Sequence, residues 1–269
     1  MTKVLLILAA IAAIVGVGWP LASSIANGGQ NEATRLVQAA DRTQNKAQSL
    51  SRSYNELVPP PGPDSASSQA STRRQQDASG DSDSSEEPTP ALSLTSSEHP
   101  VKDALDFLSR VQSELEPDNA EYVDAVNLLK AAWDPRYAHA VDEYRRFRQR
   151  IEHASDMSEE YIEVQQRLTS NISDSGVRER LRLVDAQERA LIVEWLTQAS
   201  EILAQAEDIK RNLDDMNIRI TKLELSGTFA SVYEGFSEMP LALTTLNTEL
   251  FRFEQETERI YRVFGPKAD

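Results

Sequence analysis

The chain has three histidines, the residue type that most often ligates metals or acts as a general base near neutral pH. His139 and His153 are 14 residues apart on one segment with helical periodicity, and His99 lies at the end of a polar stretch. On a helix this spacing corresponds to about 21 Å, too far for both rings to ligate one ion at bond lengths of about 2 Å. We therefore predict no metal site and no cofactor.

Carboxylates are abundant and could in principle serve acid–base chemistry. The closest sets are Glu159 with Glu160, Asp214 with Asp215, and the series Glu254, Glu256 and Glu258. A catalytic pair needs surroundings that push its two pKa values apart, whereas adjacent side chains on a helix point about 100° apart. The sequence also has no cysteine, no glycine-rich phosphate loop and no nucleophile motif. We predict a protein that is not an enzyme, and a carboxylate-based enzyme is the less favoured option.

Glu188 is a single carboxylate in an apolar heptad series, between Val184 and Leu191. A polar side chain at such a position can set the register or the choice of partner helix, at some cost in stability. Glu188 is therefore a candidate register-setting residue. The favoured alternative is a glutamate that reaches solvent beside a neighbouring arginine.

Basic and aromatic residues gather in YRRFRQR, residues 144–150, although the whole chain has a net charge of −15. Such a cluster could bind anionic headgroups, an acidic polymer or an acidic partner helix, or it could form ion pairs within the chain. The predicted partner-binding patch comprises Arg136, Tyr144, Arg145, Arg146, Phe147, Arg148 and Arg150. The acidic balance argues against nucleic-acid binding, which depends on neutralising phosphates with Lys and Arg.

Two long segments with heptad periodicity dominate the second half of the chain. The first runs over residues 177–223 with a stutter near Trp195, and the second runs over residues 239–264. Neither could hide its apolar face alone, so we expect the two to pack antiparallel. The sequence therefore predicts an all-α fold, with an elongated antiparallel helical bundle or coiled coil over residues 101–269.

Shorter helical segments precede the two long ones. Capping boxes at Asp118 with Glu121 and at Asp156 with Glu159 predict helices that begin near residues 119 and 157. Pro135 predicts a kink or a restart between them, because proline lacks the amide donor. The residues SDSG, 173–176, predict a loop.

Residues 27–58 are predicted to form a separate juxtamembrane helix with weak heptads. Its small and apolar residues step by three and four, at Ala33, Leu36, Ala40, Thr43, Ala47, Leu50, Tyr54 and Leu57. This pattern predicts either a self-associating stalk, and so a homo-oligomer, or a solvated helix. Residues 59–100 are rich in Ser, Pro and acidic residues, and they predict a disordered linker.

Residues 1–26 contain an uncharged apolar run of 19 residues, Val4 to Ala22, which is long enough to span a membrane. Small residues follow the run, so a cleaved signal peptide is the alternative. Lys3 precedes the run and no basic residue follows it closely, which favours a cytoplasmic N-terminus. We predict an anchor at residues 4–22 in the inner (cytoplasmic) membrane, with the C-terminal domain in the periplasm.

These features together predict a non-enzymatic, single-pass scaffold or adaptor of the bacterial cell envelope. Its extracytoplasmic helical domain would bind a protein partner. The alternative is a signalling or sensory membrane module, although a floppy linker transmits movement poorly. A secreted helical protein is less favoured.

Overall fold

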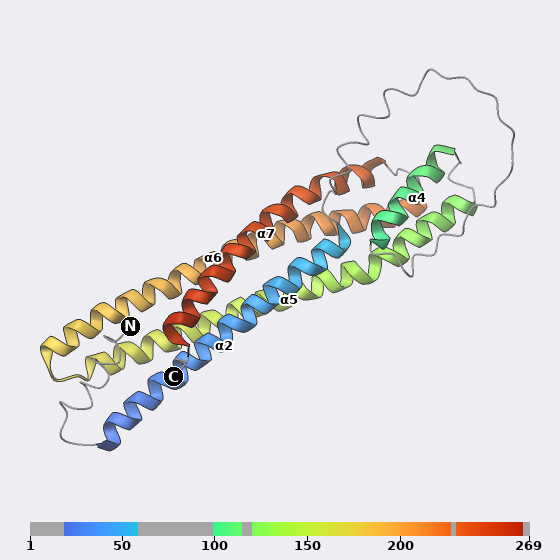
Figure 1. The fold of residues 1–269 in the computed structure, drawn as a ribbon. Helices are drawn as coiled ribbons and strands as arrows, with labels where there is room; N and C mark the ends of the chain where they lie inside the picture. The colour runs from blue at the N-terminus through green and yellow to red at the C-terminus, as the bar shows by residue number, and fades with distance from the viewer. Residues whose placement is uncertain (1–18, 59–98, 115–119, 227–229, 266–269) are drawn as a thin grey trace. The chain divides into compact units, whose positions relative to one another are not determined.

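The computed structural model describes residues 19–58, 99–114, 120–226 and 230–265. The regular elements in these ranges are all α-helices, with no strand among them, so the predicted all-α fold is confirmed. The helices are α2 (Trp19–Leu57), α4 (Pro100–Glu114), α5 (Ala120–Ser170), α6 (Ser175–Ser226) and α7 (Ala230–Phe264) (Figure 1).

The predicted membrane span, residues 4–22, lies outside the described residues except for its last four, which begin α2. Among the helices that the structure describes, none is both long enough and apolar enough to cross a membrane. The predicted span therefore stays a prediction. The predicted linker, residues 59–100, lies outside the described residues up to residue 98.

The chain folds into two compact units. Unit 1 draws its described residues from the ranges 1–47, 146–203 and 249–269, and unit 2 draws them from 48–145 and 204–248. The four long helices α2, α5, α6 and α7 each contribute a segment to both units, whereas α4 belongs to unit 2. Each unit is a bundle of helical segments, as predicted for the domain.

Unit 1 has a core of aliphatic, aromatic and small residues from α2, α5, α6 and α7. Its buried side chains include Leu36, Ala40, Thr43, Phe147, Ile151, Tyr161, Ile192, Trp195, Ile202, Phe253, Thr257, Ile260 and Phe264. The Trp195 ring stacks on Phe253, with their centroids 5.6 Å apart, and its indole N–H donates to Thr257 Oγ1 at 3.0 Å. This hydrogen bond pairs the polar groups of Trp195 and Thr257 inside the core and joins α6 to α7.

Unit 2 has a core that also includes α4. Its buried side chains include Leu50, Tyr54, Leu57, Val101, Leu108, Leu129, Trp133, Leu213, Met216, Ile220, Val232, Met239 and Leu246. The Tyr54 hydroxyl donates to the backbone oxygen of Ala206 at 3.0 Å, and the Trp133 indole donates to Asn217 Oδ1 at 3.0 Å. These bonds tie α2 and α5 to α6.

Helix α2 is part of both bundles, although the sequence suggested a separate juxtamembrane helix over residues 27–58. In unit 1, Arg35 lies 3.5 Å from Glu160, and the Thr43 hydroxyl donates to the backbone oxygen of Arg150 at 3.4 Å. In unit 2, the Ser51 hydroxyl bonds Asn247. The apolar face of α2 is therefore covered by helices of the same chain. Self-association through α2 stays a prediction.

Helix α5 runs without a break over the region where we predicted two helices. It includes Pro135, so the predicted restart there is wrong, and the helix predicted to begin near residue 157 is wrong as well. Asp156 and Glu159 lie on the exposed face of α5. The opposite face carries the buried series Ile151, Ala154, Ser158 and Tyr161. Packing of this face keeps the chain helical across residues 156–159, although they match a capping box.

Helix α6 begins at Ser175, so only the first two residues of the predicted loop, 173 and 174, precede the helix. The Asp174 carboxylate accepts the backbone N–H of Val177 at 2.9 Å, which satisfies one of the free amides of the first turn. The helix then continues to Ser226 and includes the whole predicted heptad segment of residues 177–223.

Candidate functional site

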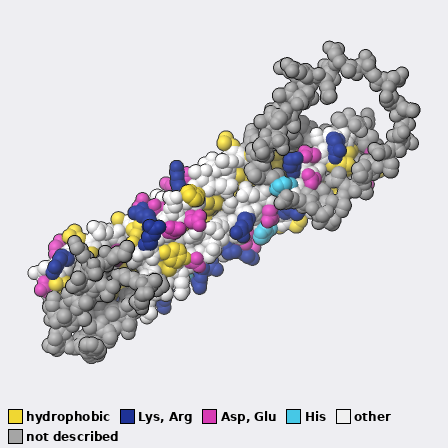
Figure 2. Space-filling view, in the orientation of Figure 1, with side chains coloured by type: hydrophobic (Ala, Val, Ile, Leu, Met, Phe, Trp, Pro, Cys, Tyr) yellow, Lys and Arg dark blue, Asp and Glu magenta, His cyan; other side chains and the backbone are white. Residues whose placement is uncertain are grey.

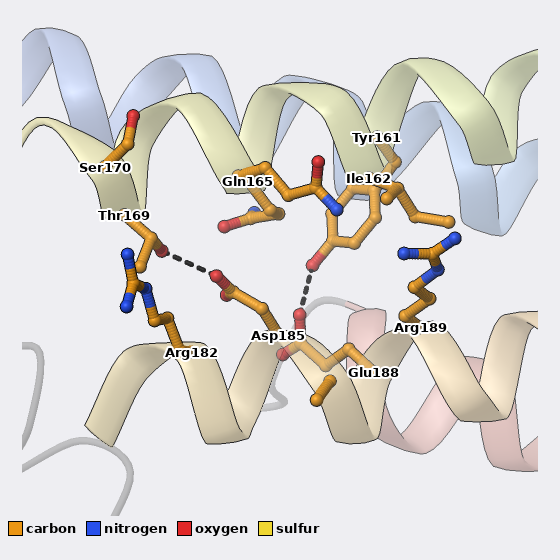
Figure 3. A pocket seen from close by; sticks show the side chains of 11 residues that line it. Tyr161, Ile162, Gln165, Thr169, Ser170, Arg182, Asp185, Glu188 and Arg189 are labelled. Atoms are coloured by element: carbon orange, nitrogen blue, oxygen red, sulfur yellow. Dashed lines mark hydrogen bonds between the residues drawn. The ribbon is translucent and has the colours of Figure 1, made fainter. Parts of the chain in front are cut away.

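A groove between α5 and α6 of unit 1 encloses about 330 Å³. Its lining side chains include Tyr161, Gln165 and Thr169 from α5, and Arg182, Asp185, Glu188 and Arg189 from α6 (Figure 3). Tyr161 and Thr169 are eight residues apart, and Asp185 and Glu188 are three apart. Both spacings place side chains on one face of a helix, so the two hydroxyls face the two carboxylates.

Two short hydrogen bonds cross this groove. The Tyr161 hydroxyl donates to Glu188 Oε2 at 2.7 Å, and the Thr169 hydroxyl donates to Asp185 Oδ2 at 2.6 Å (Figure 3). Hydrogen bonds to a charged acceptor are stronger than those between neutral groups. The pairs therefore hold the two antiparallel helices in register.

Burial in the groove favours the protonated forms of Glu188 and Tyr161. Burial raises the pKa of Glu188 above its ordinary value, and nearby Asp185 raises it further, while the hydrogen bond from Tyr161 acts in the opposite direction. Burial also raises the pKa of the Tyr161 hydroxyl, with Glu188 and Asp185 adding to the effect. Tyr161 is thus a neutral donor at physiological pH, and each carboxylate is an acceptor for a hydroxyl.

Glu188, the predicted register-setting residue, therefore bonds α5 of its own chain. Its isolation within an apolar series was the signal that identified it. Asp185, Thr169 and Tyr161 were missed, because Asp185 lies beside the heptad series and the α5 residues carry ordinary hydroxyls. The signal that could have found Asp185 is its spacing of three residues from Glu188.

The substitution Glu188→Gln should stabilise the protein above pH 5. The raised pKa of Glu188 means that the folded chain holds this proton more tightly than the unfolded chain. The wild type therefore loses stability as the pH rises from the unfolded value through the raised folded value. A glutamine still accepts from Tyr161 and does not ionise. We expect a gain of under about 1 kcal/mol at pH 7, because Glu188 stays partly exposed to solvent.

Thermal unfolding of both chains at pH 4, 5, 6 and 7 measures this difference. The gain should be smallest at pH 4 and should grow towards pH 7. The control is Glu201→Gln, which removes an exposed carboxylate from the same helix in the same unit. A gain for Glu188→Gln that is independent of pH would show that the charge of Glu188 is not its cause.

The predicted arginine patch is divided by the fold. Arg136, Tyr144 and Arg145 belong to unit 2, whereas Arg146, Phe147, Arg148 and Arg150 belong to unit 1. The aromatic side chains of Tyr144 and Phe147 are buried, while Arg145, Arg146 and Arg148 are exposed. Arg145 lies 3.6 Å from Asp142, and Arg148 lies 3.1 Å from Glu152, on α5 itself. The aromatic rings thus pack in the cores, and partner binding by the exposed arginines stays a prediction.

Unit 2 contains a second set of paired polar groups. The Tyr137 hydroxyl donates to Asp214 Oδ1 at 2.8 Å, and Lys210 contacts Asp214 Oδ2 at 2.7 Å. Burial, together with the hydrogen bond to Asp214 and its charge, raises the pKa of Tyr137 to about 12. Asp214, one of the adjacent carboxylates considered in the sequence, therefore links α6 to α5.

The histidines and acidic residues that the structure describes form no cluster of three side chains suited to a metal ion. His139 is exposed and His153 is half-buried on α5. Comparisons with protein families, with curated proteins and with solved structures find no match. Functional assignment therefore rests on the contacts of this chain.

Proposed function

We propose that this protein is a non-enzymatic scaffold or adaptor of the bacterial cell envelope. The apolar sequence of residues 4–22 would anchor it in the inner membrane, and its helical bundles would bind a protein partner on the extracytoplasmic side. This proposal comes from the arrangement of the sequence, and the contacts of the folded chain support it.

One observation carries the proposal: several aromatic side chains inside the bundles use their polar atoms to join helices. In unit 1, Tyr161 bonds Glu188 and Trp195 bonds Thr257. In unit 2, Tyr137 bonds Asp214. A catalytic centre would instead direct such groups at a shared point where a substrate could lie. The arrangement is typical of helices that serve as a rigid support.

The candidate contact residue for a protein partner is Phe251 on α7 of unit 1. Its side chain is 62% exposed, whereas Phe253, two residues later, is buried against Trp195. Exposed hydrophobic side chains emerge among charged ones on the visible face of the described helices (Figure 2). An exposed aromatic residue on a rigid helix is a suitable anchor for a partner, because aromatic residues are enriched among binding hot spots.

The substitution Phe251→Ala tests this function. In membranes from cells that express the tagged full chain, cross-linking should recover a partner protein with the wild type. Recovery should fall about tenfold or more with Phe251→Ala, as expected for the loss of one hot-spot residue. The fold should be unaffected, because this side chain packs little within its own unit.

The matched control is Gln255→Ala, an exposed polar residue one turn further along α7. It should leave recovery of the partner unchanged. A chain that stays monomeric, with no second protein cross-linked to it in any membrane preparation, would argue against a scaffold.

A further inference from the structure

The turn between α5 and α6 carries an excess of positive charge in an acidic protein. We call residues 167–184 the hairpin end. It contains four arginines, Arg167, Arg178, Arg180 and Arg182, and two carboxylates, Asp174 and Glu179, so its net charge is +2 while the whole chain has −15. All of these residues belong to unit 1.

The arginines of the hairpin end keep donors available for a ligand. Arg178 donates to the backbone oxygen of Ile172, and Arg180 donates to that of Gly176. Arg182 lies 3.6 Å from Glu179, and Arg167 has no ion pair with any described residue. Each guanidinium has five N–H donors, so one internal bond leaves most of them free to bind an anion.

The hairpin end also exposes apolar side chains. Leu183 is 61% exposed and Val184 is 39% exposed, although Val184 continues the heptad face that is buried from Leu191 onwards. The reason is that α7 ends at Phe264, whose ring packs on Tyr161. Beyond that contact, α7 no longer covers α6.

The register of α2 places its first residues level with the hairpin end. Contacts of Arg35 with Glu160 and of Thr43 with Arg150 show that α2 and α5 are antiparallel in unit 1. At 1.5 Å per residue, α2 extends about 24 Å from Arg35 back to Trp19, and α5 extends about 15 Å from Glu160 to Ser170. The start of α2 therefore lies at the same end of unit 1 as the turn (Figure 1).

We propose that the hairpin end lies on the anionic phospholipid surface of the membrane in which residues 4–22 are anchored. This inference rests on the proposed anchor, since α2 continues directly from the apolar segment. The guanidinium groups bind lipid phosphates, and Leu183 and Val184 enter the headgroup boundary. The anchor and the hairpin end then hold unit 1 at the membrane by two contacts.

An anionic membrane explains the combination of features better than an acidic protein partner does. The basic and apolar groups lie together at one end of a unit, at the level where the apolar segment of the same chain joins α2. The anchor would also hold the hairpin end close to the membrane, so weak contacts between the arginines and lipid phosphates suffice for binding. Each arginine near an anionic surface increases binding about fivefold.

The experiment uses the absence of native cysteine in the full chain. Ser173→Cys places a thiol on the exposed turn of the hairpin end, and Glu201→Cys places a control thiol on an exposed position of the same unit. Each thiol is labelled with an environment-sensitive fluorophore, and the protein is reconstituted into vesicles of phosphatidylcholine with or without phosphatidylglycerol. Quenching by aqueous acrylamide, which is neutral and not repelled by anionic lipid, measures how far the label is shielded.

We expect the label at position 173 to be shielded in vesicles with phosphatidylglycerol, and exposed in vesicles of phosphatidylcholine alone. The label at position 201 should be quenched equally in both. Replacing Arg167, Arg180 and Arg182 by glutamine should abolish the shielding. Equal quenching at positions 173 and 201 in anionic vesicles would overturn the proposal, as would shielding at 173 that requires an added membrane protein.

Failure of the anchor is a separate result. Flotation of the full chain with phosphatidylcholine vesicles tests residues 4–22 independently of lipid charge. A chain that floats with these vesicles while position 173 stays exposed in anionic ones retains the anchor and loses the hairpin contact. If the chain does not float at all, residues 4–22 are not a membrane anchor. That result would overturn both the proposed anchor and the membrane contact of the hairpin end.

Discussion

Trp195→Ala should be among the most destabilising single substitutions in unit 1, with an expected loss of about 4 kcal/mol of unfolding free energy. The Trp195 side chain is 0% exposed, its ring stacks on Phe253, and its indole N–H donates to Thr257 Oγ1 at 3.0 Å. Alanine removes the ring contacts and leaves a cavity between α6 and α7. Urea denaturation followed by circular dichroism measures the loss.

Two further variants separate packing from hydrogen bonding. Trp195→Phe keeps an aromatic ring but loses the N–H donor, so it should cost clearly less than alanine. Thr257→Val leaves the buried indole N–H without its acceptor, at an expected cost of about 1 to 3 kcal/mol. If Trp195→Phe were as damaging as Trp195→Ala, stacking on Phe253 would not be the main contribution.

The control for Trp195→Ala is Val193→Ala, two residues earlier on the same helix. Val193 is 51% exposed, and the expected change is within about 0.5 kcal/mol. Both variants introduce alanine into α6, so a difference between them reports burial and not helix propensity. A loss below about 1.5 kcal/mol for Trp195→Ala would contradict the burial of this side chain.

Heptad spacing predicted which face of each helix is buried far better than it predicted what covers that face. On α2, the buried positions include Leu36, Ala40, Thr43, Ala47, Leu50, Tyr54 and Leu57, all members of the predicted series. The helices that cover this face include α5 and α6, which lie after residue 98 in the sequence. A periodic pattern contains no information about its partner, so an intramolecular contact across a long polar segment could not be distinguished from self-association.

The ends of buried faces were equally hard to predict. The heptad series of α6 begins at Val177, yet continuous burial begins only at Leu191. The sequence of α6 alone does not contain the reason, which is that α7 ends beside Tyr161. The exposed apolar residues of the hairpin end follow from this difference in helix length.

The candidate groove could be predicted only in part, for a similar reason. Glu188 was identifiable because it is a charged residue within an apolar series. Its bond with Tyr161 depends on the register of α5 against α6, which is fixed by the length of the turn and by packing elsewhere in the unit. The predicted break near residue 157 also placed Tyr161 on a different helix from residues 120–155, and that error obscured the register.

Gly235→Leu should be the strongest test of packing in unit 2, with an expected loss of about 3 kcal/mol. A Cβ atom at this position of α7 would collide with Met216 Sδ of α6, and it would lie 3.3 Å from Arg219 Nη1. Met216 is 1% exposed, so its side chain has little room to move aside. The glycine therefore leaves room for the Met216 side chain between α6 and α7.

A double-mutant cycle shows whether the Met216 contact is the cause. Met216→Ala alone should destabilise by about 2 to 5 kcal/mol because it leaves a cavity. In the combined variant, the leucine side chain can fill that space, so the total loss should be smaller than the sum of the single losses by about 1 kcal/mol or more. Additive losses would show that Gly235 and Met216 act independently.

Gly176→Leu provides the matched control for Gly235→Leu. Gly176 lies in the first turn of α6 and is exposed, and a Cβ atom there would meet only Asp174 Oδ1, at an ordinary distance of 3.4 Å. Leucine has the higher helix propensity, so this variant should be neutral or slightly stabilising, by up to about 1 kcal/mol. The same gain in propensity applies at Gly235, and a net loss there must therefore come from the collision with α6. Equal thermal stability of the two leucine variants would exclude a costly collision with Met216 at Gly235.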